Sequence, residues 1–302
     1  MSKRYCLRIA TLDPWPSVDI GADEFRAIEE AKAKLTTILG IEEKFALLVE
    51  NYTEYERTLL DLSLKNMINQ EWHWGGFMDD TLLANRRIAN LLTGATLYLY
   101  QVPKDLTSLL GRKSESDKAF KDTWQAEEAC SLEFRVMREL RNHIQHRDLA
   151  IGNLSYPGSH KKDGKSGVRF GIEIALDVDG ICKDARIEVS KDDIRADAAK
   201  DVTAVLRKSM DSISRIHEWV RQRTEELAEC SLKKIDETLR VAEAKIGHLR
   251  GLAAVEYEDD ETREVIYVFE ELPNRVKQMR MRYGNLKLCS GWYVSSGLGA
   301  DD

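Results

Sequence analysis

A stretch near the middle of the chain, Glu133 to Asp148, collects residue types that bind phosphate and move protons. It reads EFRVMRELRNHIQHRD. Arginine offers a planar fork of donors to phosphate oxygens, and histidine exchanges a proton near neutral pH. The candidate catalytic residues are therefore Arg141, Asn142 and His146, in which the asparagine would orient a substrate group without carrying charge. The weaker candidates for substrate binding are Arg138, His143, Gln145 and Arg147.

Helical periodicity predicts that this stretch is a helix with its apolar and polar residues on different faces. Successive residues on a helix turn by about 100°. Asn142 and His146 are four residues apart, so they share one face, and Arg141 lies at its boundary. The predicted core stripe, nearly opposite, consists of Met137, Leu140 and Ile144, with Phe134 at its edge. Two interpretations remain open, a solvated basic face and a phosphate site. The second is favoured because helix interiors do not favour Asn or His.

A metal site is the competing chemistry. His143 and His146 are three residues apart, a spacing found among metal ligands on helices. Glu139 and Asp148 are nearby carboxylates, but the surrounding arginines would repel a cation. Nucleophile-elbow, Walker and dinucleotide-binding motifs are absent from the sequence. We therefore expect no metal and no cofactor.

The composition fits a helix-rich protein without a general affinity for nucleic acid. The chain has 302 residues, 32% of them charged, with five prolines and a formal net charge of −7. That negative charge argues against bulk attraction to nucleic acid but leaves room for a local basic site. The five cysteines are odd in number and form no C-x-x-C pair, so we expect reduced thiols. The sequence has no signal-peptide core and no run of 18 apolar residues, and we expect a cytoplasmic protein that does not enter a membrane.

Apolar spacing predicts a series of helices. Gly40 is expected to end the first helix and Val102-Pro103 the third. The fourth is expected to run without a break from about Asp117 through the candidate stretch. A capping box, Ser190-x-x-Asp193, opens the last helical segment. The predicted helices span residues 23–39, 42–69, 80–101, about 117–148 and about 190–246, the last with room for a break.

Strands are predicted at both ends of the chain and before the last helix. The hairpin before the last helix has Asp179-Gly180 at its turn, and a basic loop, 159–167, precedes it. The segment 71–76, EWHWGG, is predicted to be a turn whose tryptophans, Trp72 and Trp74, fold back as a cap on the core. The alternative is that they form a platform on which bases stack. The predicted strands span residues 4–12, 168–176, 181–189, 253–259 and 264–272.

These elements predict a mainly α fold. It is an antiparallel helical bundle with an inserted β-hairpin and a small β-element built from the chain termini. Residues 1–20 would form an N-terminal strand segment. Residues 21–250 would form the bundle, with the hairpin at about 168–189, and residues 251–302 a C-terminal β-rich extension.

The candidate stretch resembles the active-site motif of a known family. Arg141-Asn-His-Ile-Gln-His146 is similar to the R-x4–6-H motif of HEPN ribonucleases, with the polar residue that these motifs often carry directly after the arginine. The segment Asn85 to Leu92, NRRIANLL, resembles an earlier helix of some bacterial HEPN proteins. The resemblance covers residues 40 to 225 and implies an HEPN-like helical bundle.

The resemblance also implies a reaction. It is a metal-independent endoribonuclease, in which the 2′-hydroxyl of RNA attacks the adjacent phosphorus and leaves a 2′,3′-cyclic phosphate. His146 would act as general base or acid, Arg141 would stabilise charge on the phosphoryl oxygens, and Asn142 would position the substrate or the histidine. The alternative is a non-catalytic HEPN-like module that binds RNA, a nucleotide or another protein.

The family further implies partners. HEPN sites are usually composite, so a homodimer is expected, with RNA as substrate. Such proteins commonly serve as toxins or antiviral defence effectors, which implies an antitoxin or a defence-system partner. The chain departs from the pattern at Asp148, where toxins controlled by AMPylation often carry a tyrosine, so that form of control is not supported.

Overall fold

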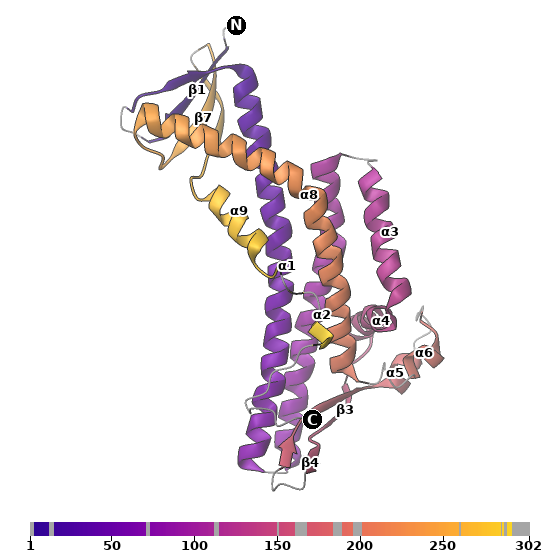
Figure 1. The fold of residues 1–302 in the computed structure, drawn as a ribbon. Coiled ribbons are helices and arrows are strands. Elements are labelled where there is room, and N and C mark those ends of the chain that lie inside the picture. Colours follow the sequence, from indigo (N-terminus) through magenta and orange to yellow (C-terminus); the bar gives the residue numbers. More distant parts are fainter. Residues whose placement is uncertain are drawn as a thin grey trace. The chain divides into compact units, whose positions relative to one another are not determined.

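The computed structural model describes residues 3–11, 15–70, 73–111, 115–149, 151–160, 168–183, 189–195, 201–259, 261–284, 286 and 289–291. The fold is mainly helical with small antiparallel sheets, as predicted (Figure 1). The helices are α1 (Ala22–Asn69), α2 (Trp74–Leu110), α3 (Glu115–Cys130), α4 (Leu132–His146), α5 (Val178–Cys182), α6 (Lys191–Arg195), α8 (Val202–Ile246), α9 (Leu272–Met281) and the 3-10 turn η1 (Cys289–Gly291). The strands are β1 (Lys3–Ile9), β2 (Val18–Ile20), β3 (Ile151–Ser155), β4 (Gly158–His160), β5 (Val168–Phe170), β6 (Glu173–Leu176), β7 (Leu252–Glu258) and β8 (Glu261–Tyr267).

The chain forms two compact units. The first contains residues 1–43, 108–111 and 219–284, and the second contains residues 44–107, 112–218 and 285–302. The long helices α1 and α8 therefore contribute to both units, and the expected bundle 21–250 is divided between them. In the part of the chain that the structure describes, no helix is long and apolar enough to span a membrane.

The first unit is built on a four-stranded antiparallel sheet with strand order β2-β1-β7-β8. Along β1, residues Lys3 to Ile9 pair with Glu258 to Leu252, so strands from the two ends of the sequence lie side by side, as predicted. One face of the sheet packs on the helices of this unit. The buried core includes Leu7, Ile9, Phe25, Ile28, Leu35, Ile235, Ala242, Ala254 and Val276.

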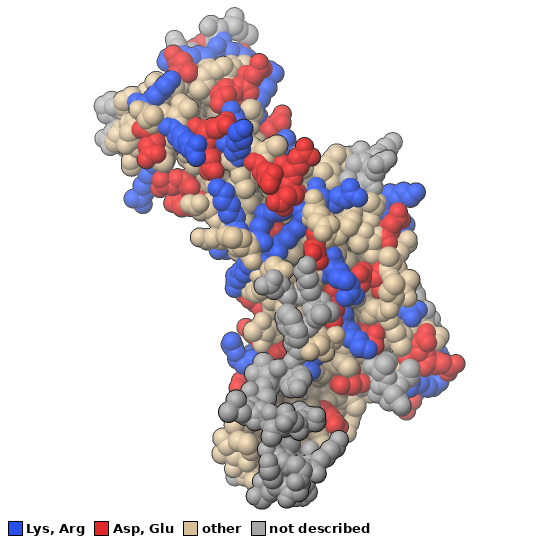
Figure 2. Space-filling view, viewed as in Figure 1, with Lys and Arg blue, Asp and Glu red and all other residues tan. Residues whose placement is uncertain are grey.

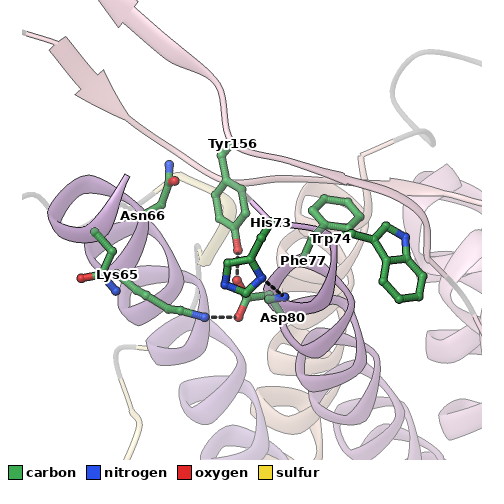
Figure 3. Close-up of a pocket in the computed structure, with 9 residues that line it drawn as sticks. Lys65, Asn66, His73, Trp74, Phe77, Asp80 and Tyr156 are labelled. Atoms are coloured by element: carbon green, nitrogen blue, oxygen red, sulfur yellow. Dashed lines mark hydrogen bonds and ion pairs between the residues drawn. The ribbon is translucent and has the colours of Figure 1, made fainter. Parts of the chain in front are cut away.

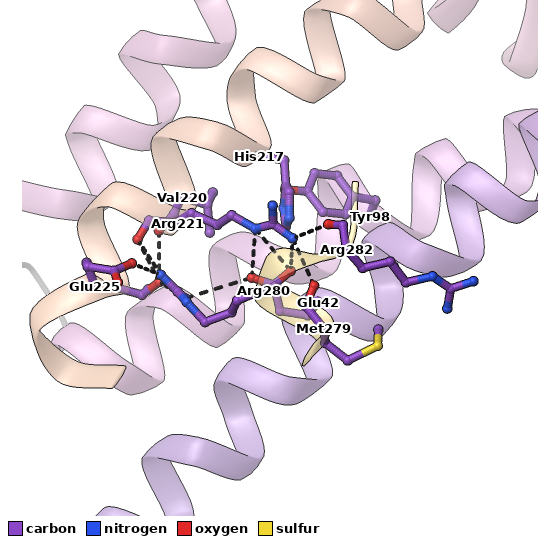
Figure 4. A network of polar contacts seen from close by, with 10 residues as sticks. Glu42, Tyr98, His217, Val220, Arg221, Glu225, Met279, Arg280 and Arg282 are labelled. Carbon is purple, nitrogen blue, oxygen red and sulfur yellow. Dashed lines mark hydrogen bonds and ion pairs between the residues drawn. The ribbon is translucent and has the colours of Figure 1, made fainter. Parts of the chain in front are cut away.

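A buried carboxylate joins three helices of the first unit (Figure 4). Glu42 of α1 is only 2% exposed. Arg221 of α8 donates to it through Nη2 at 2.6 Å and through Nε at 3.1 Å. The same Nη2 donates to the carbonyl oxygens of Met279 (3.1 Å) and Arg282 (2.9 Å) at the end of α9. Arg280 of α9 lies 3.8 Å from Glu42, so one carboxylate organises the helix ends around it.

In the second unit α1 packs closely against α2 and α8. A Cβ added at Gly94 of α2 would meet the Leu48 Cα at 3.5 Å and the Asn51 amide at 3.0 Å, so glycine allows this close helix approach without displacing the Asn51 side chain. Arg207 of α8 forms a bidentate salt bridge with Glu56 of α1, and both hydrogen bonds are 2.7 Å long. Buried apolar residues of this unit include Phe45, Leu59, Ile88, Leu92, Leu140, Val205 and Ile213.

Two of the predicted helix ends are wrong. Gly40 does not end a helix, because α1 continues through it to Asn69. A helical glycine costs about 1 kcal/mol relative to alanine, and the burial of Ile38 and Ile41 on either side offsets it. Likewise α2 continues through Pro103 to Leu110, anchored by buried apolar neighbours at Val102 and Leu106. Propensity is a weak prior that tertiary packing overrides.

The prediction of one unbroken helix through the candidate stretch is also wrong. Ser131 has an extended backbone (φ −128°) and separates α3 from α4. Its side-chain oxygen accepts a hydrogen bond from the Phe134 backbone N–H at 3.2 Å. Ser131 is therefore the N-cap of α4, so the candidate residues lie on a short helix of their own.

The predicted hairpin at about 168–189 has the wrong partners. β5 pairs with β4 and β6 pairs with β3, both antiparallel, so the partner strands precede these strands in sequence. Instead of a returning strand, residues Val178–Cys182 form α5. The Asp177 carboxylate accepts from the Gly180 N–H at 3.0 Å, so the Asp and Gly signals cap a helix where a hairpin turn was expected. The remainder of the expected strand, 184–188, and most of the basic loop, 161–167, lie outside the described residues.

Glu42→Ala is expected to destabilise the protein by roughly 3–5 kcal/mol, because it leaves the Arg221 guanidinium without its charge partner. The matched control is Glu43→Ala, next in sequence. Its carboxylate is about half exposed and lies 3.8 Å from Arg275, so its loss should cost less than about 1 kcal/mol. Denaturant unfolding of the full chain, followed by circular dichroism, measures both. Equal losses for the two variants would contradict the role given to Glu42.

Candidate functional site

Helix α4, which carries all the candidate residues but Arg147, is anchored at its start. Glu133 lies in its first turn and accepts a hydrogen bond from Lys208 of α8 at 2.5 Å. Ser209 of α8 donates to the Glu133 carbonyl oxygen at 3.1 Å. Burial acts to raise the pKa of Glu133, but the bond from Lys208 and further hydrogen bonds outweigh it and lower that pKa. The N-terminal end of α4 is thus fixed to α8 through a charged carboxylate.

The apolar face of α4 agrees largely with its prediction. Met137, Leu140 and Phe134 are buried, and Ile144 is half-buried. The buried face is wider than the sequence indicated, because it also takes in Glu139 and His143. The candidate residues therefore divide into three groups, according to where they lie around the helix.

The first group lines a shallow cleft beside α3. Arg141 and Asn142 are half-buried, and Arg141 Nη1 donates to the Asn142 side-chain oxygen at 3.0 Å. The cleft holds about 20 Å³ and is also lined by Tyr100 and Trp124. The Arg141–Asn142 pair thus presents a guanidinium and an amide at one surface.

Arg138 belongs to the same cleft but is already engaged. Its Nη1 donates to Glu128 of α3 at 2.7 Å, and Trp124 Nε1 donates to the same carboxylate oxygen at 2.9 Å. Arg138 consequently fixes α4 to α3. Binding a phosphate through it would require the Glu128 pair to open.

The second group, Gln145, His146 and Arg147, is exposed at the C-terminal end of α4. Among the residues that the structure describes, no hydrogen bond joins His146 to Arg141 or Asn142. Five residues of helix separate Arg141 from His146 by about 140° of rotation and about 7.5 Å of rise. Asn142 is only about 40° from His146 around the helix, so these two share a face while Arg141 points elsewhere.

The third group is His143 alone. It is 4% exposed, and neither ring nitrogen has a hydrogen-bond partner among the described residues. A histidine so placed does not face solvent, where a substrate would arrive. The sequence could not distinguish it from His146, because both lie within one turn of the same helix.

Acidic and basic side chains are mixed on the surface of the described residues (Figure 2). On the face shown in Figure 2, Lys and Arg alternate with Asp and Glu over the described residues. This pattern agrees with the net charge of −7. Within the described ranges, no three His, Cys, Asp or Glu side chains come together as metal ligands.

A second feature, a cavity of about 190 Å³, lies in the second unit at the end of α1 and the start of α2 (Figure 3). Trp74, at its edge, is 78% exposed, so the prediction that it caps the core is wrong; Trp72 lies outside the described residues. The exposed-looking tryptophans were the one signal near this cavity, and the sequence did not indicate its other side, because Tyr156 is 76 residues beyond its partner Asp80. The polar and aromatic residues that line it include Lys65, Asn66, His73, Trp74, Asp80 and Tyr156.

Comparisons with known proteins add no assignment. No protein-family model matches the sequence, and no curated protein and no solved structure is significantly similar to it. The resemblance to HEPN ribonucleases therefore rests on the motif in α4 and on the segment Asn85 to Leu92 in α2.

The stability contributed by Glu133 is expected to depend on pH. Because the folded-state pKa is lowered, the contribution is complete above the unfolded pKa, about 4.3, and is lost as pH falls through the lower folded value. Glu133→Gln should therefore be less stable than the wild type at pH 7, and the difference should shrink below about pH 4.3. Thermal unfolding across pH measures it. The control is Asp122→Asn, at an exposed position on α3. If the stability difference between Glu133→Gln and the wild type is as independent of pH as that of the control, the role given to Glu133 is contradicted.

His143→Leu is expected to leave stability unchanged or to raise it by about 1 kcal/mol, because leucine needs no hydrogen-bond partner in a buried site. His146→Ala, an exposed position, should stay within about 0.5 kcal/mol of the wild type. Denaturant unfolding compares the three proteins. A loss above about 1 kcal/mol for His143→Leu would mean that the imidazole has a partner that the leucine cannot replace.

Proposed function

We propose that the second unit acts as an HEPN-type, metal-independent endoribonuclease with Arg141, Asn142 and His146 at its active site. The observation that carries this proposal is that His146 is exposed and that Arg141 and Asn142 are only half-buried. His146 is exposed, Asn142 shares its face of α4, and Arg141 donates to Asn142, while the other face of the helix is buried. A proton-transfer group and a phosphate ligand are therefore open to a substrate on a well-anchored helix.

The reaction follows from the chemistry of these groups. His146 takes the proton of an RNA 2′-hydroxyl, and the 2′ oxygen attacks the adjacent phosphorus. The bond from phosphorus to the 5′ oxygen breaks, and a second acid returns a proton to that oxygen. The products are a 2′,3′-cyclic phosphate and a 5′-hydroxyl. Arg141 stabilises the negative charge on the phosphoryl oxygens, and Asn142 holds the substrate.

The geometry of α4 favours a site shared between two copies of the chain. Arg141 and His146 point about 140° apart around the helix. In a twofold dimer the Arg141 side of each α4 meets the His146 face of its copy, and the two His146 side chains near the axis supply the base and the second acid. The homodimer is part of the proposal.

The biological role that we propose is that of a toxin or antiviral defence effector acting on RNA. An intracellular ribonuclease must be restrained until it is needed, so an antitoxin or a defence-system partner belongs to the same proposal. A cytoplasmic location agrees with an RNA substrate.

A second candidate is a non-catalytic module that binds RNA, a nucleotide or another protein. One observation favours it, because among the described residues none forms a hydrogen bond that orients the His146 ring. Catalytic histidines are usually held by a third group. Only a cleavage assay separates the two candidates.

The test is incubation of the purified protein with mixed RNA, with and without EDTA. We expect cleavage that EDTA does not abolish, and products that end in a 2′,3′-cyclic phosphate. His146→Ala should cut at least about 100-fold more slowly, because general acid–base catalysis contributes about 10²–10⁴-fold. The matched control is His248→Ala in the first unit, where the histidine stacks on Trp15, and it should cleave like the wild type.

Three results would contradict the proposal. Equal cleavage by His146→Ala and the wild type would exclude the role given to His146. Loss of cleavage in EDTA would indicate a metal-dependent reaction. Cleavage at a position that carries a 2′-deoxy sugar would exclude attack by the 2′-hydroxyl, because that sugar lacks the nucleophile.

A further inference from the structure

The floor of the cavity between the end of α1 and the start of α2 is a carboxylate whose negative charge is balanced by a lysine (Figure 3). Asp80 is 8% exposed. Lys65 Nζ donates to one of its oxygens at 2.7 Å, and the Tyr156 hydroxyl donates to the other at 2.6 Å. Burial, and then the bond to Asp80, raise the pKa of Tyr156, so its phenol stays protonated as a donor. With its charge balanced by a lysine, this floor does not suit a metal cation.

The wall of the cavity holds a polar group that lacks a partner. Asn66 is 7% exposed, and its Nδ2 has no hydrogen-bond partner among the described residues. A buried donor without a partner is destabilising, and an acceptor on a bound molecule would satisfy it. The orphaned amide therefore points to a ligand with an acceptor atom.

His73 supplies a second donor. Its Nδ1 accepts a hydrogen bond from the Gly76 backbone N–H at 2.9 Å, so the neutral ring carries its proton on Nε2. A Cβ at Gly76 would lie 2.8 Å from the ring, so glycine makes room for this arrangement. The ring lines the cavity beside the aromatic residues Trp74 and Phe77.

Two aromatic side chains on the first turns of α2 complete the cavity. Trp74 is largely exposed at its edge and Phe77 is half-buried. Exposed aromatic rings offer faces on which planar molecules stack. A cavity of about 190 Å³ is far larger than the roughly 10–15 Å³ that one water requires. It therefore has room for a planar ring system.

We propose that this cavity binds a nucleobase, which stacks on Trp74 and accepts hydrogen bonds from Asn66 and His73. The site is separate from α4 and goes beyond the proposed cleavage reaction. We take single-stranded RNA as the source of the base, and this choice rests on the proposed ribonuclease function. A free nucleotide offers the same chemistry.

The donors of the cavity set a preference among bases. Uracil and guanine present carbonyl oxygens to such donors, whereas adenine accepts only through ring nitrogens and carries an amino group in place of the carbonyl oxygen. The cavity is therefore expected to prefer uracil or guanine over adenine.

The test is fluorescence anisotropy with short labelled 2′-deoxy oligonucleotides, one of uracil and one of adenine. These strands cannot be cut by 2′-hydroxyl attack, so the binding result does not depend on the ribonuclease activity. We expect tighter binding of the uracil strand. Trp74→Ala and Asn66→Leu should each weaken its binding about 10-fold or more, in the range of measured base-stacking and hydrogen-bond losses. Asn66→Leu removes an unpaired polar group, so the fold should be retained.

The matched control is Leu82→Ala, an exposed position on the same helix, which should bind like the wild type. Competition with uridine monophosphate identifies the source of the base. If uridine monophosphate displaces the labelled strand at a concentration similar to that of the strand, the site is assigned to a free nucleotide. If displacement requires a much higher nucleotide concentration, the site is assigned to a strand. Unchanged binding in both Trp74→Ala and Asn66→Leu, or equal binding of adenine and uracil, would overturn the proposal.

Discussion

Charge pairs made by α8 hold the helices of each unit in place. In the second unit, Arg207 reaches α1, Lys208 reaches α4 and Arg215 reaches α3, each through a carboxylate 2.5–2.7 Å away. In the first unit, Arg221 reaches the buried Glu42. Half-exposed pairs contribute little singly, but here each also fixes which helix lies beside α8. These four basic residues of α8 are therefore engaged in structure.

The sequence predicts those parts of the fold that local patterns determine. Apolar spacing along α8 and pairing between the terminal strands agree with the structure, because periodicity directly reports burial. The errors arise where the same short residue pattern can specify two different local structures. Asp177 and Gly180 cap α5 in a segment where Asp-Gly suggested a hairpin turn, and Ser131 caps α4 in a segment where no break was expected. Gly40 and Pro103 are overridden by packing that only the folded chain reveals.

The candidate site shows the same limit. Helical geometry correctly separates the buried Met137 from the exposed His146. Helical geometry cannot predict that the Arg138 guanidinium pairs with Glu128, ten residues earlier. The break in the helix places these two residues on different helices. Helical geometry also treats His143 as a polar residue available to substrate, whereas the neighbouring elements bury it. The cavity near Tyr156 depends on contacts between distant segments, so no pattern in the sequence predicts it.

A net charge of −7 constrains how the proposed ribonuclease would hold RNA. Arg87, Arg138 and Arg207 are paired with carboxylates, which lowers the phosphate attraction that these arginines would offer to non-specific binding. Affinity would then come from contacts with bases. Stacking and hydrogen bonds in a cavity hold an unpaired base without a basic groove, and they change little with salt because few counterions are released. In that arrangement the cavity beside Trp74 would determine which strand binds, and the residues of α4 would cleave its backbone.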